Sequence, residues 1–107
     1  MDKLRGNKKT WFVTRHEGAV RWAQEKGIHV DRIVAHLDDA VLEEIQPGDV
    51  VIGTLPLHLA AKVCEKGAKY LHLSLDLPPQ ARGRELTPEE MDRFGARLEA
   101  FEVRCCE

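Results

Sequence analysis

The sequence has few of the residues on which common enzyme and scaffold classes depend. It has a single serine, Ser74, and no GxSxG elbow, so it encodes no serine nucleophile of the hydrolase type. Its three cysteines, Cys64, Cys105 and Cys106, form neither a CxxC pair nor an even framework, which excludes a disulfide scaffold or a zinc knuckle. No two histidines have HExxH or other ligand spacing. We therefore expect no metal site and no cofactor.

Nucleotide-cofactor and membrane signals are absent as well. Neither GxxxxGK[ST] nor GxGxxG occurs, which disfavours nucleoside triphosphate and dinucleotide cofactors. Sixteen Lys and Arg against eighteen Asp and Glu give a net charge of −2, unlike the strongly basic face of a duplex-binding protein. No apolar run approaches the roughly 20 residues that cross a bilayer, and no signal-type segment follows the charged start. We expect a cytoplasmic protein that binds neither membranes nor duplex nucleic acid, with a small anionic ligand left open.

What remains is enough for one folded domain. The chain has 107 residues, of which 43% are hydrophobic and 32% charged, so it can bury an ordinary core. Residues 1–9 are polar and basic and predict a flexible tail whose lysines and arginine could approach a phosphate. Residues 10–107 then form a single domain.

Short hydrophobic runs alternate with stretches of helical spacing. Strands are predicted at 11–13, 32–37, 50–52 and 70–75, and 102–106 either forms an edge strand or frays. Helices are predicted through Ala19–Ala23 with a stop at Gly27, over 38–45, over 57–64 with a stop at Gly67, and from the capping box at Thr87 through Met91, Phe94, Leu98 and Phe101. This alternation predicts an α/β fold, a small Rossmann-like domain with a mainly parallel sheet flanked by helices.

Two strand-turn-helix units repeat at an offset of about 40 residues. The offset places Thr14 on Thr54, and Glu25-Lys26-Gly27 on Glu65-Lys66-Gly67. Open α/β sheets bind ligands at the carboxyl ends of their strands. If the repeat is more than chance, both threonine loops face one crevice.

The first of these loops, Thr14-Arg15-His16, joins a buried strand to a helix N-terminus, where free amides favour an anion. Arg15 offers a planar donor fork suited to phosphate, and His16 can exchange a proton near neutral pH. The alternative is that Thr14 or His16 only caps the helix and that Arg15 pairs with an acid.

The second loop is Gly53-Thr54. Glycine lets a ligand approach the backbone, and the threonine hydroxyl can bond a phosphate oxygen. The alternative is plain helix capping by Thr54, with Pro56 in the first turn.

A third group lies around the end of the last predicted parallel strand. Ser74, Asp76, Arg82 and Arg84 belong to a proline- and glycine-containing segment that can fold over a bound anion as a lid. Alternatively, the segment is a solvated connection whose arginines pair with Glu85 or Asp92. The adjacent acids Asp38 and Asp39 could hold magnesium, although helix capping is the commoner role.

Three segments of the chain resemble a known family. They are TWFVTRHEGAVRWA at 10–23, PGDVVIGTLPLHLAAKVCEKGAKYLHLSLDLP at 47–78 and ARGRELTPEEM at 81–91. Together they are similar to a small single-domain CRISPR-associated family found with type III systems. The resemblance implies a ring nuclease: a metal-independent homodimer with a CRISPR-associated Rossmann fold that binds cyclic tetra-adenylate and cuts it to linear di-adenylate.

The implied reaction is attack by a ribose 2′-hydroxyl on the neighbouring phosphate, which leaves a 2′,3′-cyclic phosphate. Position and chemistry then suggest roles for the candidate residues: Arg15 stabilises phosphate charge and His16 exchanges a proton. Thr14, Gly53 and Thr54 orient the phosphates, and Arg82 and Arg84 close over them. A module that binds or sequesters the messenger without cutting it, and an interaction domain whose function is its dimer surface, are the alternatives.

Overall fold

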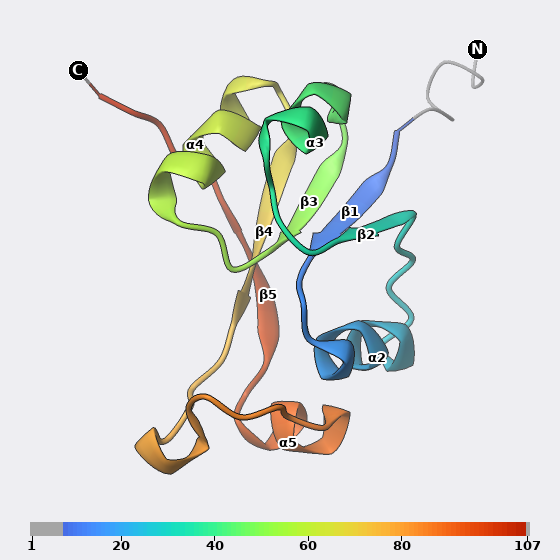
Figure 1. Ribbon diagram of the computed structural model, residues 1–107, viewed down its shortest axis with the longest axis vertical. Helices are drawn as coiled ribbons and strands as arrows, with labels where there is room; N and C mark the ends of the chain where they lie inside the picture. Colours follow the sequence, from blue (N-terminus) through green and yellow to red (C-terminus); the bar gives the residue numbers. More distant parts are fainter. Residues whose placement is uncertain (1–7, 107) are drawn as a thin grey trace.

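One five-stranded sheet carries helices on both of its faces (Figure 1). The computed structural model describes residues 8–106, so most of the predicted basic tail, residues 1–7, lies outside the described residues. The strands are β1 (Thr10–Val13), β2 (Arg32–Val34), β3 (Val50–Gly53), β4 (Lys69–Ser74) and β5 (Arg97–Phe101). The helices are α2 (Glu17–Glu25), α3 (Asp39–Glu44), α4 (Leu57–Glu65) and α5 (Pro88–Arg93), with a short 3-10 turn η1 (Pro79–Ala81).

The strand order is β2-β1-β3-β4-β5. The first four strands run parallel, and β5 pairs antiparallel with β4. The α/β class with a mainly parallel sheet is therefore confirmed. Within residues 8–106, no helix is long and apolar enough to span a bilayer.

The central strands β1 and β3 are buried on both faces, which explains their continuous hydrophobic runs. Trp11 and Val51 point to one face, where they pack with Leu42 of α3 and Val63 of α4. Their neighbours Phe12 and Ile52 point to the other face. There they pack with side chains of α2 and α5, among them Trp22 and Met91.

The offset of 40 residues between the two strand-turn-helix units is a structural repeat. Thr10 pairs with Val50 and Val13 with Gly53, so β1 and β3 lie side by side in that same offset. The helices α2 and α4 span equivalent positions but cover opposite faces of the sheet. The chain leaves β1 toward β2 and leaves β3 toward β4, which makes the β1–β3 boundary the topological switch point.

The predicted last helix is too long. It ends after Arg93, because Gly95 adopts a positive φ of 75° that stops the helix. Leu98 and Phe101, predicted on the helix face, lie in β5, opposite Leu73 and Tyr70 of β4. The edge strand is consequently Arg97–Phe101, and not residues 102–106.

The second strand is shorter than the predicted 32–37. It ends at Val34 because its partner β1 ends at Val13. The chain then turns out of the sheet, so that Ala35, His36 and Leu37 lie at the carboxyl edge and are free to line a pocket there.

A buried carboxylate joins the beginnings of β1 and β3. Asp49 is only 1% exposed, and its oxygens accept hydrogen bonds from the N–H groups of Lys9 and Gln46 and from the indole Nε1 of Trp11. Lys9, placed in the predicted tail, thus hydrogen-bonds to the domain. This clamp lies at the opposite edge of the sheet from the switch point, and it fixes the two strands whose far ends form the candidate site.

Candidate functional site

A pocket of about 730 Å³ lies at the topological switch point. The loops after β1, β2 and β3 contribute to it, and the segment after β4 forms a further wall. Its polar and charged lining residues are Thr14, Arg15, His16, His36, Thr54, Arg84 and Glu85. Thr14 and Thr54 therefore line one pocket, as the repeat in the sequence predicts.

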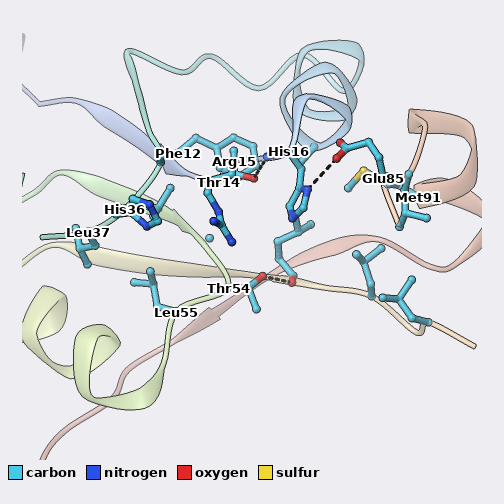
Figure 2. A pocket seen from close by; sticks show the side chains of 18 of the residues that line it. Phe12, Thr14, Arg15, His16, His36, Leu37, Thr54, Leu55, Glu85 and Met91 are labelled. Carbon is cyan, nitrogen blue, oxygen red and sulfur yellow. Dashed lines mark hydrogen bonds and ion pairs between the residues drawn. The ribbon is translucent and has the colours of Figure 1, made fainter. Parts of the chain in front are cut away.

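The β1–α2 loop supplies the first candidate group. The hydroxyl of Thr14 accepts a hydrogen bond of 3.1 Å from the backbone N–H of His16 and so shapes the turn. His16 occupies the N-cap position of α2 but makes no side-chain capping bond. The guanidinium of Arg15 has no hydrogen-bond or ion-pair partner among residues 8–106, so the predicted alternative of an acidic partner is wrong for the described chain. Figure 2 shows Arg15 and His16 extending from this loop toward Thr54.

The ring of His16 is held on one side. Its Nδ1 lies 2.9 Å from Oε1 of Glu85, and Oε2 of the same carboxylate accepts a bond of 3.1 Å from the N–H of Gly18 (Figure 2). These two bonds lower the pKa of Glu85 below its usual value, and the bond with His16 has the larger effect. The carboxylate is therefore ionised at neutral pH. The carboxylate thereby takes one of the first-turn amides of α2 that the sequence suggests for an anion.

The β3–α4 loop supplies the second group. A Cβ on Gly53 would lie 3.1 Å from the carbonyl oxygen of Val13, so glycine lets the ends of β1 and β3 run this close together. The hydroxyl of Thr54 donates to the carbonyl of Leu73 at 3.1 Å. Thr54 is therefore not the N-cap of α4, which is Pro56, and the capping alternative is wrong.

A tyrosine behind this loop holds its backbone in place. The hydroxyl of Tyr70 in β4 accepts a bond of 2.9 Å from the N–H of Leu55 and donates to the carbonyl of Gly53 at 3.2 Å. It also lies 2.6 Å from Nδ1 of His72. Burial raises the pKa of Tyr70, which keeps the hydroxyl protonated and able to donate.

Of the third predicted group, Ser74, Asp76, Arg82 and Arg84, only Arg84 lines the pocket. Ser74 donates to Glu99 at 2.6 Å, and Asp76 pairs with Arg97 at 3.3 Å, so both side chains engage β5 and neither lines the pocket. Arg84 does line the pocket and pairs with Glu90 at 2.8 Å.

Arg82, the last residue of the third group, and the acidic pair at Asp38 lie outside the pocket lining. Arg82 follows η1 on an exposed stretch outside the pocket lining. Asp38 accepts from the N–H of Val41 and caps α3, as its commoner role predicts. Within the part of the chain that the structure describes, no three His, Cys, Asp or Glu side chains gather as a metal site would require.

Hydrophobic side chains fill the walls between these polar groups. Leu37, Leu55 and Leu59 belong to the core on one face of the sheet, and Leu73, Leu75 and Met91 to the core on the other face. In Figure 2, Leu37 and Leu55 lie on the far side of Arg15 from Met91. The pocket thus combines a cationic centre with apolar walls, an arrangement suited to an anion that carries flat or apolar groups.

Three contributors were missed at the level of sequence: Glu85, His36 and Tyr70. The contacts of Glu85 with His16 and Gly18 span 69 and 67 residues, and no motif links them. His36 and Tyr70 fall in stretches that the sequence predicts as strands. The only sequence feature of His36 that is typical of a ligand site is its place as a polar residue near the carboxyl end of a predicted strand.

Fold and site together define the class: a small doubly wound α/β protein with a partly cationic pocket at its switch point. The chain belongs to a CRISPR-associated family, because the family described as "Putative CRISPR-associated protein (Cas_VVA1548)" matches residues 11–104. Comparisons with curated proteins and with solved structures found no match.

Proposed function

We propose that the protein is a ring nuclease that acts in the cytoplasm on the cyclic tetra-adenylate messenger of type III CRISPR defence. The observation that carries the proposal is the pair Arg15 and His16. One loop directs an imidazole, and a guanidinium that has no partner among residues 8–106, into a pocket at the switch point. Membership of a CRISPR-associated family supports this choice of ligand. The proposed products are linear di-adenylates with 2′,3′-cyclic phosphate ends.

The proposed step needs no nucleophile from outside the ligand. A ribose 2′-oxygen forms a bond to the adjacent phosphorus, and the bond from phosphorus to the 5′-oxygen of the next nucleotide breaks. The 2′-hydroxyl loses a proton and the departing 5′-oxygen gains one, so the atoms balance. The protein contributes by aligning the attacking and leaving oxygens and by stabilising the charge on the phosphate.

Each residue of the two loops has a part in this step. Arg15 binds the non-bridging oxygens of the phosphate that reacts, and His16 exchanges a proton at its Nε2, since Nδ1 is engaged by Glu85. Thr14, Gly53 and Thr54 orient the ligand backbone. Arg84 closes the pocket from the β4–α5 side, and Arg82 approaches from the adjoining exposed stretch.

The apolar walls and the symmetry of the ligand complete the proposal. Leu37, Leu55 and Leu59 offer a surface on which an adenine base can pack. A ring of four phosphates matches two copies of the pocket related by a two-fold axis, so we expect a homodimer with one ring bound between its protomers.

Substitution of the two central residues tests the proposal. Arg15→Ala and His16→Ala should each lower single-turnover cleavage by roughly 100-fold or more, the range for loss of charge stabilisation or of acid-base help. Arg21→Ala in α2 and His29→Ala before β2 are matched controls, since both residues are exposed and outside the pocket lining. Full activity in both pocket variants, with the controls also active, overturns the assignment.

A further inference from the structure

The carboxylate of Glu85 bridges two donors of the β1–α2 unit. One oxygen lies 2.9 Å from the Nδ1 of His16, and the other accepts from the N–H of Gly18 at 3.1 Å. Because both oxygens are engaged, the carboxylate cannot rotate without losing a bond. Its position relative to the imidazole is therefore set by the first turn of α2.

The backbone next to Glu85 is fixed on the same turn. A Cβ on Gly18 would lie 1.9 Å from the carbonyl oxygen of Leu86, so the chain at 85–86 packs directly against a glycine of α2. The nearest cation in sequence, Arg84, lines the pocket but pairs with Glu90. Among residues 8–106, Glu85 therefore has no arginine partner and engages His16.

We infer that Glu85 is the positioning residue for His16: it holds the ring proton on Nδ1 and leaves Nε2 as the nitrogen that exchanges a proton with the ligand. This inference rests on the proposed function for its catalytic consequence. Glu85 does not touch the reacting atoms itself, and it acts through the orientation and tautomer of the imidazole.

The negative charge of Glu85 distinguishes a role in positioning His16 from a role in binding the ligand. Glu85 places a negative charge in a pocket proposed to bind a polyanion, and it occupies an amide of α2 that a phosphate could otherwise use. Removal of this charge should therefore leave affinity for cyclic tetra-adenylate unchanged or make it tighter. Cleavage should nevertheless become slower, because the orientation of His16 is lost.

The cleavage rates and ligand affinities of Glu85→Gln and Glu85→Ala test whether cleavage and binding respond differently. Single-turnover cleavage should fall about tenfold or more, while the dissociation constant stays equal or decreases. In a His16→Ala background, Glu85→Gln should cause no further loss, since a positioning residue has nothing left to position. Glu89→Gln, an exposed carboxylate on α5, is the matched control and should cleave at the wild-type rate. A further loss in the double variant, or full activity in both Glu85 variants, overturns the inference.

A ligand-free readout separates this inference from the proposed function. Nitrogen-15 NMR of the His16 ring should show the proton on Nδ1 in the wild-type protein and a loss of that preference in Glu85→Ala. Unchanged ring signals in Glu85→Ala overturn the inference even if the wild-type protein cleaves the ring. The expected ring signals in a protein that does not cleave cyclic tetra-adenylate support the hold of Glu85 on His16 and overturn the proposed function instead.

Discussion

The hydroxyl of Tyr70 accepts a hydrogen bond of 2.9 Å from the backbone N–H of Leu55. The same hydroxyl donates to the carbonyl of Gly53, so one side chain of β4 satisfies two backbone groups of the loop that follows β3. Tyr70 is 2% exposed and Gly53 is buried, so the bond between the hydroxyl and the carbonyl of Gly53 is shielded from solvent. The shape of this side of the pocket thus depends on a residue that does not line it.

Tyr70→Phe should therefore disturb the pocket but keep the core packed, because phenylalanine retains the aromatic ring. Loss of the hydroxyl leaves the N–H of Leu55 without its acceptor, and the free energy of unfolding should fall by about 1–3 kcal/mol. If the β3–α4 loop binds the ligand as proposed, the dissociation constant of cyclic tetra-adenylate should rise as well. Urea unfolding and equilibrium binding measure the two effects.

His72→Ala provides the comparison for Tyr70→Phe. It removes the 2.6 Å contact between the tyrosine hydroxyl and Nδ1 of His72, together with the edge-on ring contacts of His72 to Tyr70 and Phe101, whereas the bonds to Leu55 and Gly53 remain. Binding should change less than in Tyr70→Phe. Equal effects of the two variants on affinity would contradict the claim that the bonds of Tyr70 to Leu55 and Gly53 shape the ligand site.

Gly18→Ala should destabilise the protein, although alanine is normally the better helix former. In an open helical position the change would stabilise by up to about 1 kcal/mol. Here the added Cβ would lie 1.9 Å from the carbonyl oxygen of Leu86, a backbone atom, so we expect a loss of about 1–3 kcal/mol. Thermal and urea unfolding should be compared with the exposed Gln24→Ala in the same helix. A stabilised Gly18→Ala protein would contradict the packing of residues 85–86 on α2.

Asp49 should make stability depend on pH. Burial raises the pKa of Asp49, but hydrogen bonds from the N–H groups of Gln46 and Lys9 and from the indole of Trp11 outweigh burial. The pKa therefore lies below the ordinary value of 3.8. A carboxyl with a lowered folded-state pKa stabilises the fold at neutral pH, and this contribution is lost as pH falls from about 5 toward the folded-state pKa.

Asp49→Asn should cost about 3 kcal/mol at neutral pH, because an amide cannot accept the three bonds as a carboxylate does. The difference from wild type should shrink as the wild-type carboxyl becomes protonated in acid. Urea unfolding at several pH values checks this, with the exposed Asp39→Asn as control. A difference that is the same at about pH 7 and about pH 2.5, well below the ordinary pKa, contradicts the lowered pKa.

The sequence predicts the two repeated βα units because their signals are local. Buried strands, glycine stops and a 40-residue offset place Thr14 and Thr54 together, and the pocket confirms that placement. The last element was mispredicted, since Met91, Phe94, Leu98 and Phe101 keep a helical spacing across the break at Gly95.

Contacts between residues far apart in the sequence could not be predicted. Glu85 reaches His16 across 69 residues, and Tyr70 reaches Leu55 across 15, through pairings that only the folded sheet creates. For the same reason, the engagement of Ser74 and Asp76 with β5 could not be foreseen while the strand itself was unrecognised. The ligand-binding roles of these two residues stay predictions.

The most direct measurement is incubation of the purified protein with cyclic tetra-adenylate, with and without excess chelator, and identification of the products by liquid chromatography and mass spectrometry. We predict conversion to di-adenylate with a 2′,3′-cyclic phosphate at the same rate in both conditions. Intact ring that co-elutes with the protein would contradict the nuclease and favour a binding or sequestering module. Intact ring that does not bind would contradict the messenger as ligand altogether.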